Sequence, residues 1–557
     1  MNTGELNLAW ADAFVAALAA AGLRHVALGP GARSAPLAAA CLRRPEIECH
    51  VINDERAAGF FALGIGKATG RPAAVLTTSG TAAANLLPAV MEANLAGVPL
   101  LALTADRPPE YHGGHGWGAN QSVDQTRLYG EHARAFHAVP LPEAGIDAGY
   151  LRALAARLLE TALAPLPGPV HANLPFREPL LPATLAPPPP LPAPIAIRPP
   201  APAAPENLAA VAARLSGRPG VIVCGGGDYP AGFAAAVTQL AARLDAPILA
   251  DPLANLRHGP YDRTHVLAYA ARFLRADAPT APDWVLRLGA FPVSRVLERW
   301  LAGLDGAEHL LVAPPGRWPD PLWRSGTVLR GDPRAIAESL ASHCRPAGTD
   351  FFSRWHAAEE RAARGPDAAF FEGTAARALL AALPAGAHCF VGNSLAIRAV
   401  DAFGGMGGTG DKPLTLHGNR GASGIDGNLA TAAGIAAATR MPIGLLVGDQ
   451  TLLHDCGSLA LLAGRDAVIV LLDNGGGGIF DHLSFAPTLP PELLERGWTA
   501  PPRADCAALA TAFGLDYAQA DDAPGLDAAL ASAFARGGAW LLRVIVDRAA
   551  SRAGFAA

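Results

Sequence analysis

Two segments in the last quarter of the chain carry oxygen-bearing side chains that can bind a metal ion. The apolar run 443–447 ends in Gly448-Asp449, and the apolar run 468–472 ends in Asp473-Asn474, which four glycines follow. Both runs are typical of strands buried on both faces of a parallel sheet, and adjacent strands of such a sheet end at the same edge. A carboxylate, an amide oxygen and accessible backbone carbonyls suit Mg²⁺, and glycines let a diphosphate approach the backbone. The sequence therefore predicts a site for a metal ion and a diphosphate.

The spacing of these segments resembles the signature of thiamine-diphosphate (ThDP) enzymes, in which Gly-Asp-Gly is followed after roughly 25–30 residues by Asn-Asn. By this resemblance, the side chains of Asp449 and Asn474 and the backbone carbonyl of Gly476 bind Mg²⁺ or Mn²⁺. Gln450 replaces the second glycine of the signature and Asp473 replaces its first asparagine. Neither replacement removes an expected metal ligand.

A ThDP enzyme also needs a carboxylic acid that exchanges a proton with the aminopyrimidine ring of the cofactor. Glu55 fits because it follows the strand-like segment 47–53, begins a helical segment and precedes an apolar run over 57–61. An ordinary acidic residue stabilised by a helix N-terminus has the same local pattern. The metal–diphosphate segments downstream favour Glu55 as the activating acid.

Several further segments resemble the MenD family, the 2-succinyl-5-enolpyruvyl-6-hydroxy-3-cyclohexene-1-carboxylate synthases of menaquinone biosynthesis. The run Asn-Arg-Gly-Ala-Ser-Gly-Ile-Asp over 419–426 is the most specific of them. The resemblance spans nearly the whole chain in family order, and its segments are 29–37, 54–56, 78–82, 104–110, 118–121, 391–395, 419–427 and 476–480.

The alternation of strand-like and helical segments independently indicates an α/β fold. Strands are expected at 47–53, 73–77, 98–104, 221–224, 247–250, 389–391, 443–447, 468–472 and 540–546, with helices at 55–69 and 81–95. Residues 182–205 contain eleven prolines, which indicates a linker. We expect three consecutive parallel-sheet α/β domains of the ThDP-dependent decarboxylase type: a pyrimidine-binding domain (1–181), the linker (182–205), a central domain (206–350) and a diphosphate-binding domain (351–557).

The resemblance implies a transferase that decarboxylates 2-oxoglutarate and adds the succinyl carbanion to isochorismate by 1,4-addition, with ThDP and Mg²⁺ or Mn²⁺ as cofactors. It also implies a homodimer or homotetramer in which Glu55 of one chain meets Asp449 and Asn474 of another.

Both substrates are dicarboxylates, and arginine binds carboxylates in a bidentate manner. By resemblance, the substrate ligands are Arg33, Arg107, Asn120, Gln121, Arg295, Ser394, Arg398, Arg420 and Phe480. The expected catalytic residues are Glu55, Arg33, Gln121, Ser394, Arg398, Arg420 and Ile425, with Ile425 as the wedge that bends the cofactor. The other expected cofactor contacts are Ser79, Gly80, Thr81, Asn393, Ser423, Gly424, Gly448, Gln450, Thr451, Gly478, Ile479 and Phe480. Two positions depart from the family: Arg295 replaces a common lysine, and Ala32 replaces a common serine. The loss of the serine hydroxyl should remove one hydrogen bond near the reacting centre, worth about 1 kcal/mol.

Composition excludes several other classes of protein. The net charge of -5 gives no reason to expect a nucleic-acid or membrane-surface partner. The seven cysteines contain no CxxC pair, which favours reduced thiols and a cytoplasmic location. No apolar run reaches the ~20 residues of a membrane span.

Two alternatives remain open. The first is a ThDP-dependent 2-oxo acid decarboxylase or an acetolactate synthase-like carboligase, which the several arginines disfavour because a monocarboxylate would leave positive charge unpaired. The second is a catalytically silent ThDP-fold sensor, which the joint presence of Glu55, Asp449 and Asn474 disfavours.

Overall fold

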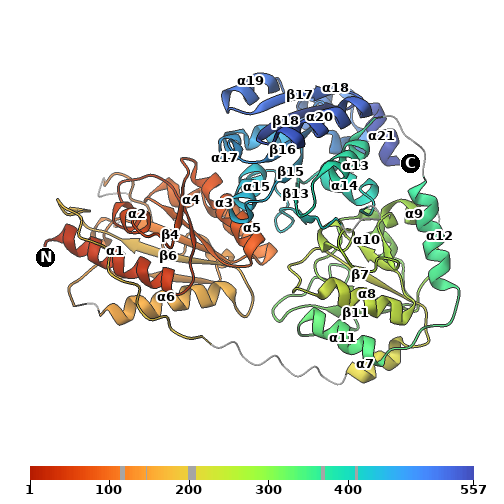
Figure 1. Cartoon of the computed structure of the whole chain (residues 1–557), viewed down its shortest axis with the longest axis horizontal. Helices are drawn as coiled ribbons and strands as arrows, with labels where there is room; N and C mark the ends of the chain where they lie inside the picture. Colours follow the sequence, from red (N-terminus) through yellow and green to blue (C-terminus); the bar gives the residue numbers. More distant parts are fainter. Residues whose placement is uncertain are drawn as a thin grey trace. The chain divides into compact units, whose positions relative to one another are not determined.

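A computed structural model of the chain describes residues 1–112, 119–145, 147–197, 208–276, 278–364, 370–407 and 412–556. These residues contain three six-stranded sheets in which the paired strands are parallel, and helices pack beside each sheet (Figure 1). The fold class predicted from the sequence, three consecutive parallel-sheet α/β domains, is confirmed. The predicted limits of the domains stay predictions.

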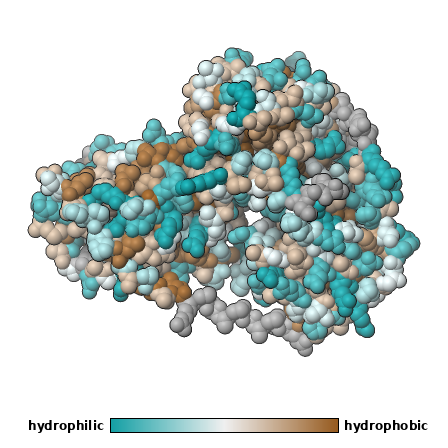
Figure 2. Space-filling view, in the orientation of Figure 1, coloured by the Kyte–Doolittle hydropathy of each residue, from teal (hydrophilic) through white to brown (hydrophobic). Residues whose placement is uncertain are grey.

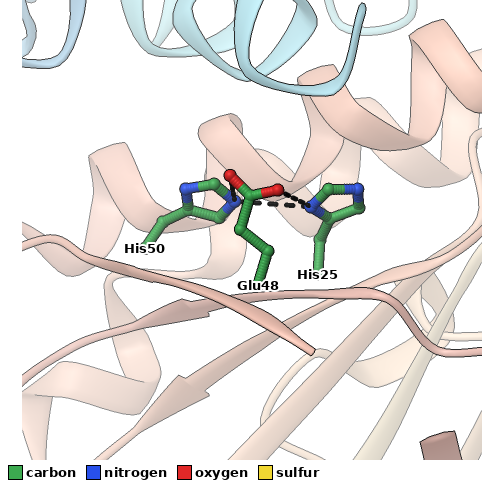
Figure 3. A group of neighbouring side chains, drawn as sticks. All are labelled: His25, Glu48 and His50. Carbon is green, nitrogen blue, oxygen red and sulfur yellow. Dashed lines mark hydrogen bonds and ion pairs between the residues drawn. The ribbon is translucent and has the colours of Figure 1, made fainter. Parts of the chain in front are cut away.

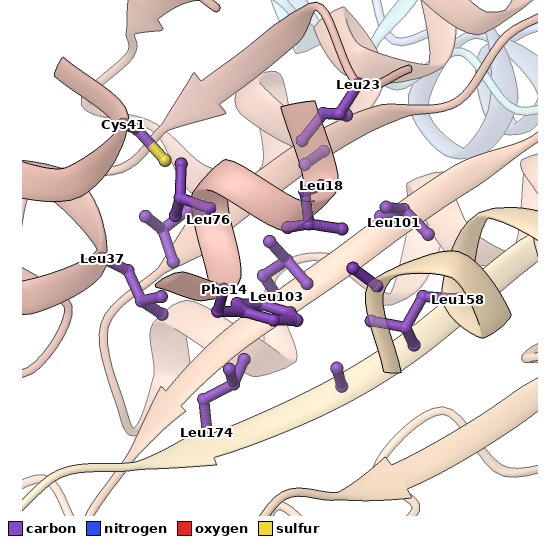
Figure 4. Close-up of a cluster of buried hydrophobic side chains, with 14 of the residues drawn as sticks. Phe14, Leu18, Leu23, Leu37, Cys41, Leu76, Leu101, Leu103, Leu158 and Leu174 are labelled. Carbon is purple, nitrogen blue, oxygen red and sulfur yellow. The ribbon is translucent and has the colours of Figure 1, made fainter. Parts of the chain in front are cut away.

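The first sheet has the strand order β2-β1-β3-β4-β6-β5. Its strands are β1 (His25–Leu28), β2 (Glu48–Val51), β3 (Ala73–Thr77), β4 (Leu100–Asp106), β5 (Ala135–Ala138) and β6 (Pro169–Pro175). The helices α1 (Thr3–Ala20), α2 (Ala35–Leu42) and α6 (Ala148–Leu163) share one core with alternate residues of the strands. Figure 4 shows this core, in which Phe14 and Leu18 of α1 lie near Leu101 and Leu103 of β4. Burial of this apolar surface is the main force that holds these helices on the sheet.

The segment predicted as one helix over 81–95 is two helices, α4 (Thr81–Ala84) and α5 (Leu87–Ala96). This part of the prediction is wrong because Pro88 cannot continue a helix from the preceding turn. Its ring lacks an N–H donor and clashes with the carbonyl of the residue four positions before it. A proline is tolerated in the first turn of a new helix, which is where Pro88 lies in α5. The helix α3 (Glu55–Thr69) has the predicted limits.

The second sheet has the strand order β12-β11-β10-β7-β8-β9. Its strands are β7 (Gly220–Cys224), β8 (Ile248–Ala250), β9 (Val266–Leu267), β10 (Trp284–Leu288), β11 (Glu308–Val312) and β12 (Thr327–Leu329). The helices of this region are α7 (Leu208–Leu215), α8 (Phe233–Leu244), α9 (Ala270–Ala276), α10 (Arg295–Ala302), α11 (Pro333–His343) and α12 (Phe351–Ala363).

The third sheet has the strand order β14-β13-β15-β16-β18-β17. Its strands are β13 (His388–Val391), β14 (Thr415–His417), β15 (Ile443–Gly448), β16 (Ala467–Asp473), β17 (Asp516–Ala520) and β18 (Ala539–Ile545). Its region contains the helices α13 (Glu372–Ala382), α14 (Leu395–Phe403), α15 (Asn428–Thr439), α16 (Asp449–His454), α17 (Leu459–Leu462), α18 (Pro491–Leu494), α19 (Cys506–Ala512), α20 (Ala523–Arg536) and α21 (Arg548–Ala556). Strands β15 and β16 are adjacent, as the metal–diphosphate prediction requires.

The chain divides into two compact units. The first consists of 1–199, 419–440 and 455–461, and the second consists of the remaining residues. Helix α15 therefore belongs to the first unit although it lies within the third part of the sequence. It packs on α3 through Gly64 and Gly434, where a Cβ would overlap the backbone of the other helix. The described part of the predicted linker, 182–197, forms no helix or strand, and its remainder lies outside the described residues.

On the face seen in Figure 2, hydrophobic residues form separate patches among polar ones. Within the described ranges, no helix is long and apolar enough to cross a membrane. All seven cysteines are free, as predicted from their spacing.

Candidate active site

The carboxyl ends of β15 and β16 hold a buried carboxylate in the second unit. Asp449 is the first residue of α16, and its two carboxylate oxygens accept hydrogen bonds from the backbone N–H groups of Gly476 (2.6 Å) and Gln450 (2.7 Å). Burial raises the pKa of the Asp449 carboxyl to about 7, and these two hydrogen bonds offset part of the shift. A divalent cation would stabilise the ionised form of this carboxylate.

The side chain of Asn474 is oriented by a second buried acid. Its Nδ2 donates to Oε1 of Glu372 over 2.8 Å, and the hydroxyl of Ser551 donates to the same oxygen over 2.9 Å. Glu372 is the first residue of α13 and is fully buried. Because the amide nitrogen of Asn474 is committed to Glu372, its Oδ1 is the atom left to accept or to coordinate.

The backbone between these side chains turns sharply at Gly476, which has a φ of 122°. A Cβ on this residue would overlap the carbonyl oxygen of Thr499, and the same oxygen accepts a hydrogen bond of 2.7 Å from the N–H of Gly477. Only glycine fits this position without displacing the loop. Asp473, which departs from the ThDP signature, pairs with Arg543 of β18 at 2.6 Å.

These residues fit a hard divalent ion. The carboxylate of Asp449, the amide oxygen of Asn474 and the backbone near Gly476 are all oxygen donors, which is the set that Mg²⁺ takes together with phosphate oxygens. The three predicted metal ligands lie at one edge of the third sheet. Beside them, Gly448 ends β15, Thr451 is buried in α16, and Gly478 packs on Asn474. Ile479 packs against the hydrophobic core of this domain, and Phe480 follows it in the same short helix.

A second loop of this unit follows β13. Asn393 is buried, and Ser394 has a φ of 67°, immediately before α14. The guanidinium of Arg398 donates to the carbonyl of Ser394 over 2.6 Å. The predicted substrate residues Ser394 and Arg398 are therefore adjacent in space.

In the first unit, Glu55 begins α3 after Asp54, whose side chain accepts a hydrogen bond from the N–H of Ala57 and caps the helix. The Glu55 side chain is half-buried. Asn85 donates to its Oε2 at 3.5 Å, and a Cβ at Gly29 would lie 3.3 Å from its Cγ. The absence of a side chain at residue 29 leaves room for Glu55 beside the end of β1.

The predicted cofactor loop 79–81 is held by a buried polar network. The N–H of Gly80 donates to Oε1 of Gln125 over 2.9 Å, and Nε2 of Gln125 donates to Oδ1 of Asn173 over 2.7 Å. The hydroxyl of Thr104 donates to the same Asn173 oxygen over 2.8 Å and contacts Nε2 of His171 at 2.8 Å. Side chains on β4 and β6 thereby fix the position of Gly80.

The other predicted residues of the loop are nearby. Ser79 is buried, and Thr81 begins α4. Gln121, which has a φ of 54°, lies within 3.4 Å of the Cβ position of Gly80. Asn120 is exposed beside it, and Gly118 lies outside the described residues.

Two predicted substrate arginines converge on one carboxylate. Arg33 is buried and donates to the carbonyl of Phe176 over 2.8 Å and to Glu178 over 2.8 Å. Arg107 approaches the same carboxylate at 3.6 Å, and the Glu178 side chain is 67% exposed. The carboxylate of Glu178 thus pairs with both guanidinium groups.

The remaining predicted residues lie elsewhere. Arg295 is the first residue of α10 in the second sheet region, where its side chain is 73% exposed and pairs with Glu298. Arg420, Gly424 and Ile425 are half-buried, whereas Ser423 is exposed with a φ of 61°. Gly424 lines a cavity of about 250 Å³ together with Phe60, Met91 and Asn419.

Four supporting residues were not recognised in the sequence. Glu372 orients Asn474, and Gln125 holds Gly80. Glu92 accepts hydrogen bonds from the N–H groups of Gly421 and Ala422 at 3.0 and 2.6 Å, and Asp455 accepts from the first turn of α15. Each acts on a segment at least 25 residues away, so no local spacing identifies it.

The three parallel-sheet domains, with Glu55 in the first and the oxygen set of Asp449 and Asn474 in the third, are those of a ThDP-dependent enzyme. Residues 9–128 match the family model described as the thiamine pyrophosphate enzyme N-terminal TPP binding domain, and residues 409–544 match its C-terminal TPP binding domain. The matched ranges contain Glu55 in the first case and the predicted metal ligands in the second.

Similarity to known proteins identifies the family within the ThDP-dependent enzymes. A 2-succinyl-5-enolpyruvyl-6-hydroxy-3-cyclohexene-1-carboxylate synthase from Dechloromonas aromatica is 42% identical over 98% of this chain and 99% of the relative. Proteins of the same name from Halobacterium salinarum (40% identical; 99% of this chain and 97% of the relative) and Chloroflexus aurantiacus (39%; 97% and 93%) are also similar. The chain belongs to the 2-succinyl-5-enolpyruvyl-6-hydroxy-3-cyclohexene-1-carboxylate synthase family.

Proposed function

We propose that this chain converts 2-oxoglutarate and isochorismate to 2-succinyl-5-enolpyruvyl-6-hydroxy-3-cyclohexene-1-carboxylate and CO₂, with ThDP and Mg²⁺. The observation that carries the proposal is the oxygen set formed by Asp449, Asn474 and Gly476 at the carboxyl edge of β15 and β16, in a chain that resembles named synthases over nearly its whole length.

The bound cofactor would supply the electron sink for loss of CO₂. Asp449, Asn474 and the Gly476 carbonyl would hold Mg²⁺ against the diphosphate. Gly80 and its neighbours would contact the cofactor, and Glu55 would exchange a proton with the aminopyrimidine ring. Mn²⁺ could replace Mg²⁺ because it accepts the same oxygen ligands.

The substrate carboxylates would be bound by arginines. Arg33 and Arg107 already share the carboxylate of Glu178, which supports a role in binding a carboxylate-bearing substrate. The rest of the proposed substrate set consists of Asn120, Gln121, Arg295, Ser394, Arg398, Arg420 and Phe480.

We further propose a homodimer or homotetramer in which Glu55 of one chain serves the metal site of another. Sedimentation of the protein with ThDP and Mg²⁺ tests this proposal, because a monomer with full activity would contradict it. The expected cytoplasmic location also stays a prediction.

CO₂ release from 2-oxoglutarate, with and without isochorismate, tests the reaction. Turnover that depends on isochorismate supports the proposal. Equal CO₂ release without an acceptor would instead assign a decarboxylase, and no release would assign a cofactor-binding sensor.

The role of Glu55 is tested separately by Glu55→Gln. The variant should bind ThDP and Mg²⁺ but exchange the C2 proton of ThDP at least about 100-fold more slowly, since the amide cannot exchange a proton with the ring. NMR detects this exchange directly. A normal exchange rate would remove Glu55 from the mechanism.

A further inference from the structure

Two histidines and a glutamate form a cluster on the first sheet, outside the residues assigned to the active site. His25 lies on β1, and Glu48 and His50 lie on the neighbouring edge strand β2. The strands pair in parallel with His25 opposite Glu48, so all three side chains project from the same face (Figure 3). His50 also packs against Phe61 of α3, with ring centroids 4.8 Å apart.

The polar atoms of this cluster contact one another at the long end of hydrogen-bond and ion-pair distances. Nδ1 of His25 lies 3.4 Å from Nε2 of His50, and the Glu48 carboxylate lies 3.8 Å from His25 and 3.9 Å from His50. Nitrogen–oxygen hydrogen bonds are typically 2.7–3.2 Å long. The three side chains point toward one another, and Figure 3 marks the contacts between them with dashed lines.

The same spacing is close to that of ligands around a tetrahedral metal ion. Two imidazole nitrogens, each ~2.05 Å from a tetrahedral Zn²⁺, lie about 3.4 Å apart. The two histidines have this separation, and one Glu48 oxygen lies near each of them, Oε2 at 3.8 Å from His25 and Oε1 at 3.9 Å from His50. One ligand atom from each residue lies within 4.8 Å of the others.

The surroundings also suit a cation. Burial lowers the pKa of His25, which keeps its imidazole neutral and able to coordinate. The side chains of His25 and His50 are 19% and 10% exposed, whereas Glu48 is 44% exposed, so an ion can enter from solvent. Arg440 lies 3.5 Å from Glu48, but its side chain is 81% exposed and can turn away.

A second histidine pair in the chain provides a contrast. His388 of β13 and His417 of β14 approach to 2.9 Å, which is the length of an ordinary hydrogen bond between two imidazoles. That pair is not part of a three-residue group of metal-ligand type among the described residues.

We propose that His25, Glu48 and His50 bind a borderline divalent ion of the Zn²⁺ type, with the fourth coordination position open to water. The ion cross-links the edge strand β2 to β1. Two imidazoles and one carboxylate favour Zn²⁺, or Co²⁺ as its probe, over Mg²⁺, which prefers oxygen ligands in an octahedron. The site is separate from the oxygen set of Asp449.

Titration calorimetry of the full-length, ThDP-free protein with Zn²⁺ tests this site. Excess Mg²⁺ is present throughout to occupy the oxygen site. We expect one Zn²⁺ per chain in the wild type, with affinity reduced at least about tenfold in Glu48→Gln and His50→Ala. The matched control His417→Ala, from the hydrogen-bonded pair, should retain wild-type affinity.

The choice of variants and one further measurement keep the test decisive. Glu48 is 44% exposed, so Glu48→Gln replaces the carboxylate ligand without opening the space beside Phe61 that His50→Ala creates. The absorption spectrum of the Co²⁺-loaded wild type should show the strong visible bands of tetrahedral Co²⁺, and these bands should be lost in both ligand variants. Zn²⁺ affinity that is equal in wild type and both variants, or no Zn²⁺ binding by the wild type, would overturn the proposal.

Discussion

The buried imidazole of His171 should make the first domain sensitive to acid. Its Nε2 lies 2.8 Å from the Thr104 hydroxyl, which itself donates to Asn173, so Nε2 carries the proton and donates to Thr104. Among the described residues, its buried Nδ1 has no hydrogen-bond partner, and the ring contacts Tyr129 and Phe136. Protonation would place an N–H and a positive charge where no acceptor lies, and burial accordingly lowers the pKa of His171 to about 3.

The size of the effect follows from the difference between the folded and unfolded states. The unfolded chain takes up the proton near pH 6.5, whereas the folded chain does so near pH 3. Above pH 6.5, the neutral His171 therefore contributes fully to the free energy of unfolding. Below pH 6.5, this contribution falls by about 1.4 kcal/mol per pH unit as the pH falls toward 3. At pH 4.5, protonation of this residue in the unfolded chain should have lowered the free energy of unfolding of the domain by about 2.7 kcal/mol.

Hydrogen exchange of β4 and β6, compared between the wild type and His171→Gln, measures this loss. Glutamine can donate to Thr104 but does not titrate. The ratio of wild-type to variant protection in these strands should fall about 100-fold between pH 7.5 and pH 4.5. His343→Gln, an exposed histidine on α11, is the control and should show no such change. An equal ratio at both pH values would refute the assignment of His171 as a buried neutral imidazole.

Three further variants test the second unit. Gly476→Ala should weaken Mg²⁺-dependent ThDP binding at least about tenfold in calorimetry, because its Cβ would overlap the Thr499 carbonyl at a positive φ. Glu372→Ala should raise the Mg²⁺ concentration needed for half-maximal ThDP binding about tenfold and lower the free energy of unfolding by about 1–3 kcal/mol, since the amide of Asn474 loses its buried acceptor. Arg257 pairs with the buried carboxylate of Asp401 at 2.9 Å. Arg257→Ala should therefore lower the free energy of unfolding, measured with a denaturant, by about 3–5 kcal/mol, because Asp401 loses this partner.

Each of these predictions has a matched control. Gly497→Ala adds a Cβ that meets no atom of the described residues within 4 Å, so normal cofactor binding is expected. Ser551→Ala removes the other donor to Glu372 but keeps the bond between Glu372 and Asn474. It should therefore raise the Mg²⁺ concentration needed for half-maximal ThDP binding by less than Glu372→Ala does. Arg354→Ala breaks an exposed pair with Asp350 and should change the free energy of unfolding by less than about 1 kcal/mol. Equal effects of a variant and its control would contradict the corresponding prediction.

The class of fold and nine of the eighteen strands in the described residues were predictable from local patterns. The apolar runs 443–447 and 468–472 are strands that end at Gly448 and Asp473, within one residue of the predicted limits. Strands buried on both faces leave such runs in the sequence, because every residue of the strand contacts a helix layer or the core. The adjacency of β15 and β16 follows from the preference of sequential parallel strands to pair.

The supporting groups of the candidate site were not predictable in this way. Glu372 lies 102 residues from Asn474, and Gln125 lies 45 residues from Gly80. A glutamate that begins a helix has the same local pattern whether it faces solvent or orients a buried amide. The break between α4 and α5 was missed for a different reason, since the apolar pattern was followed across Pro88.

Residue types and their order were therefore enough to establish the class of fold, the strand ends and the chemistry available at them, because strand burial and turn formation depend on neighbouring residues. The partners of individual polar groups depended on the folded chain. Arg33 meets Glu178 and His25 meets His50 only after strands distant in sequence have paired, because hydrogen bonds and metal sites require distances of a few ångströms that local pattern does not encode.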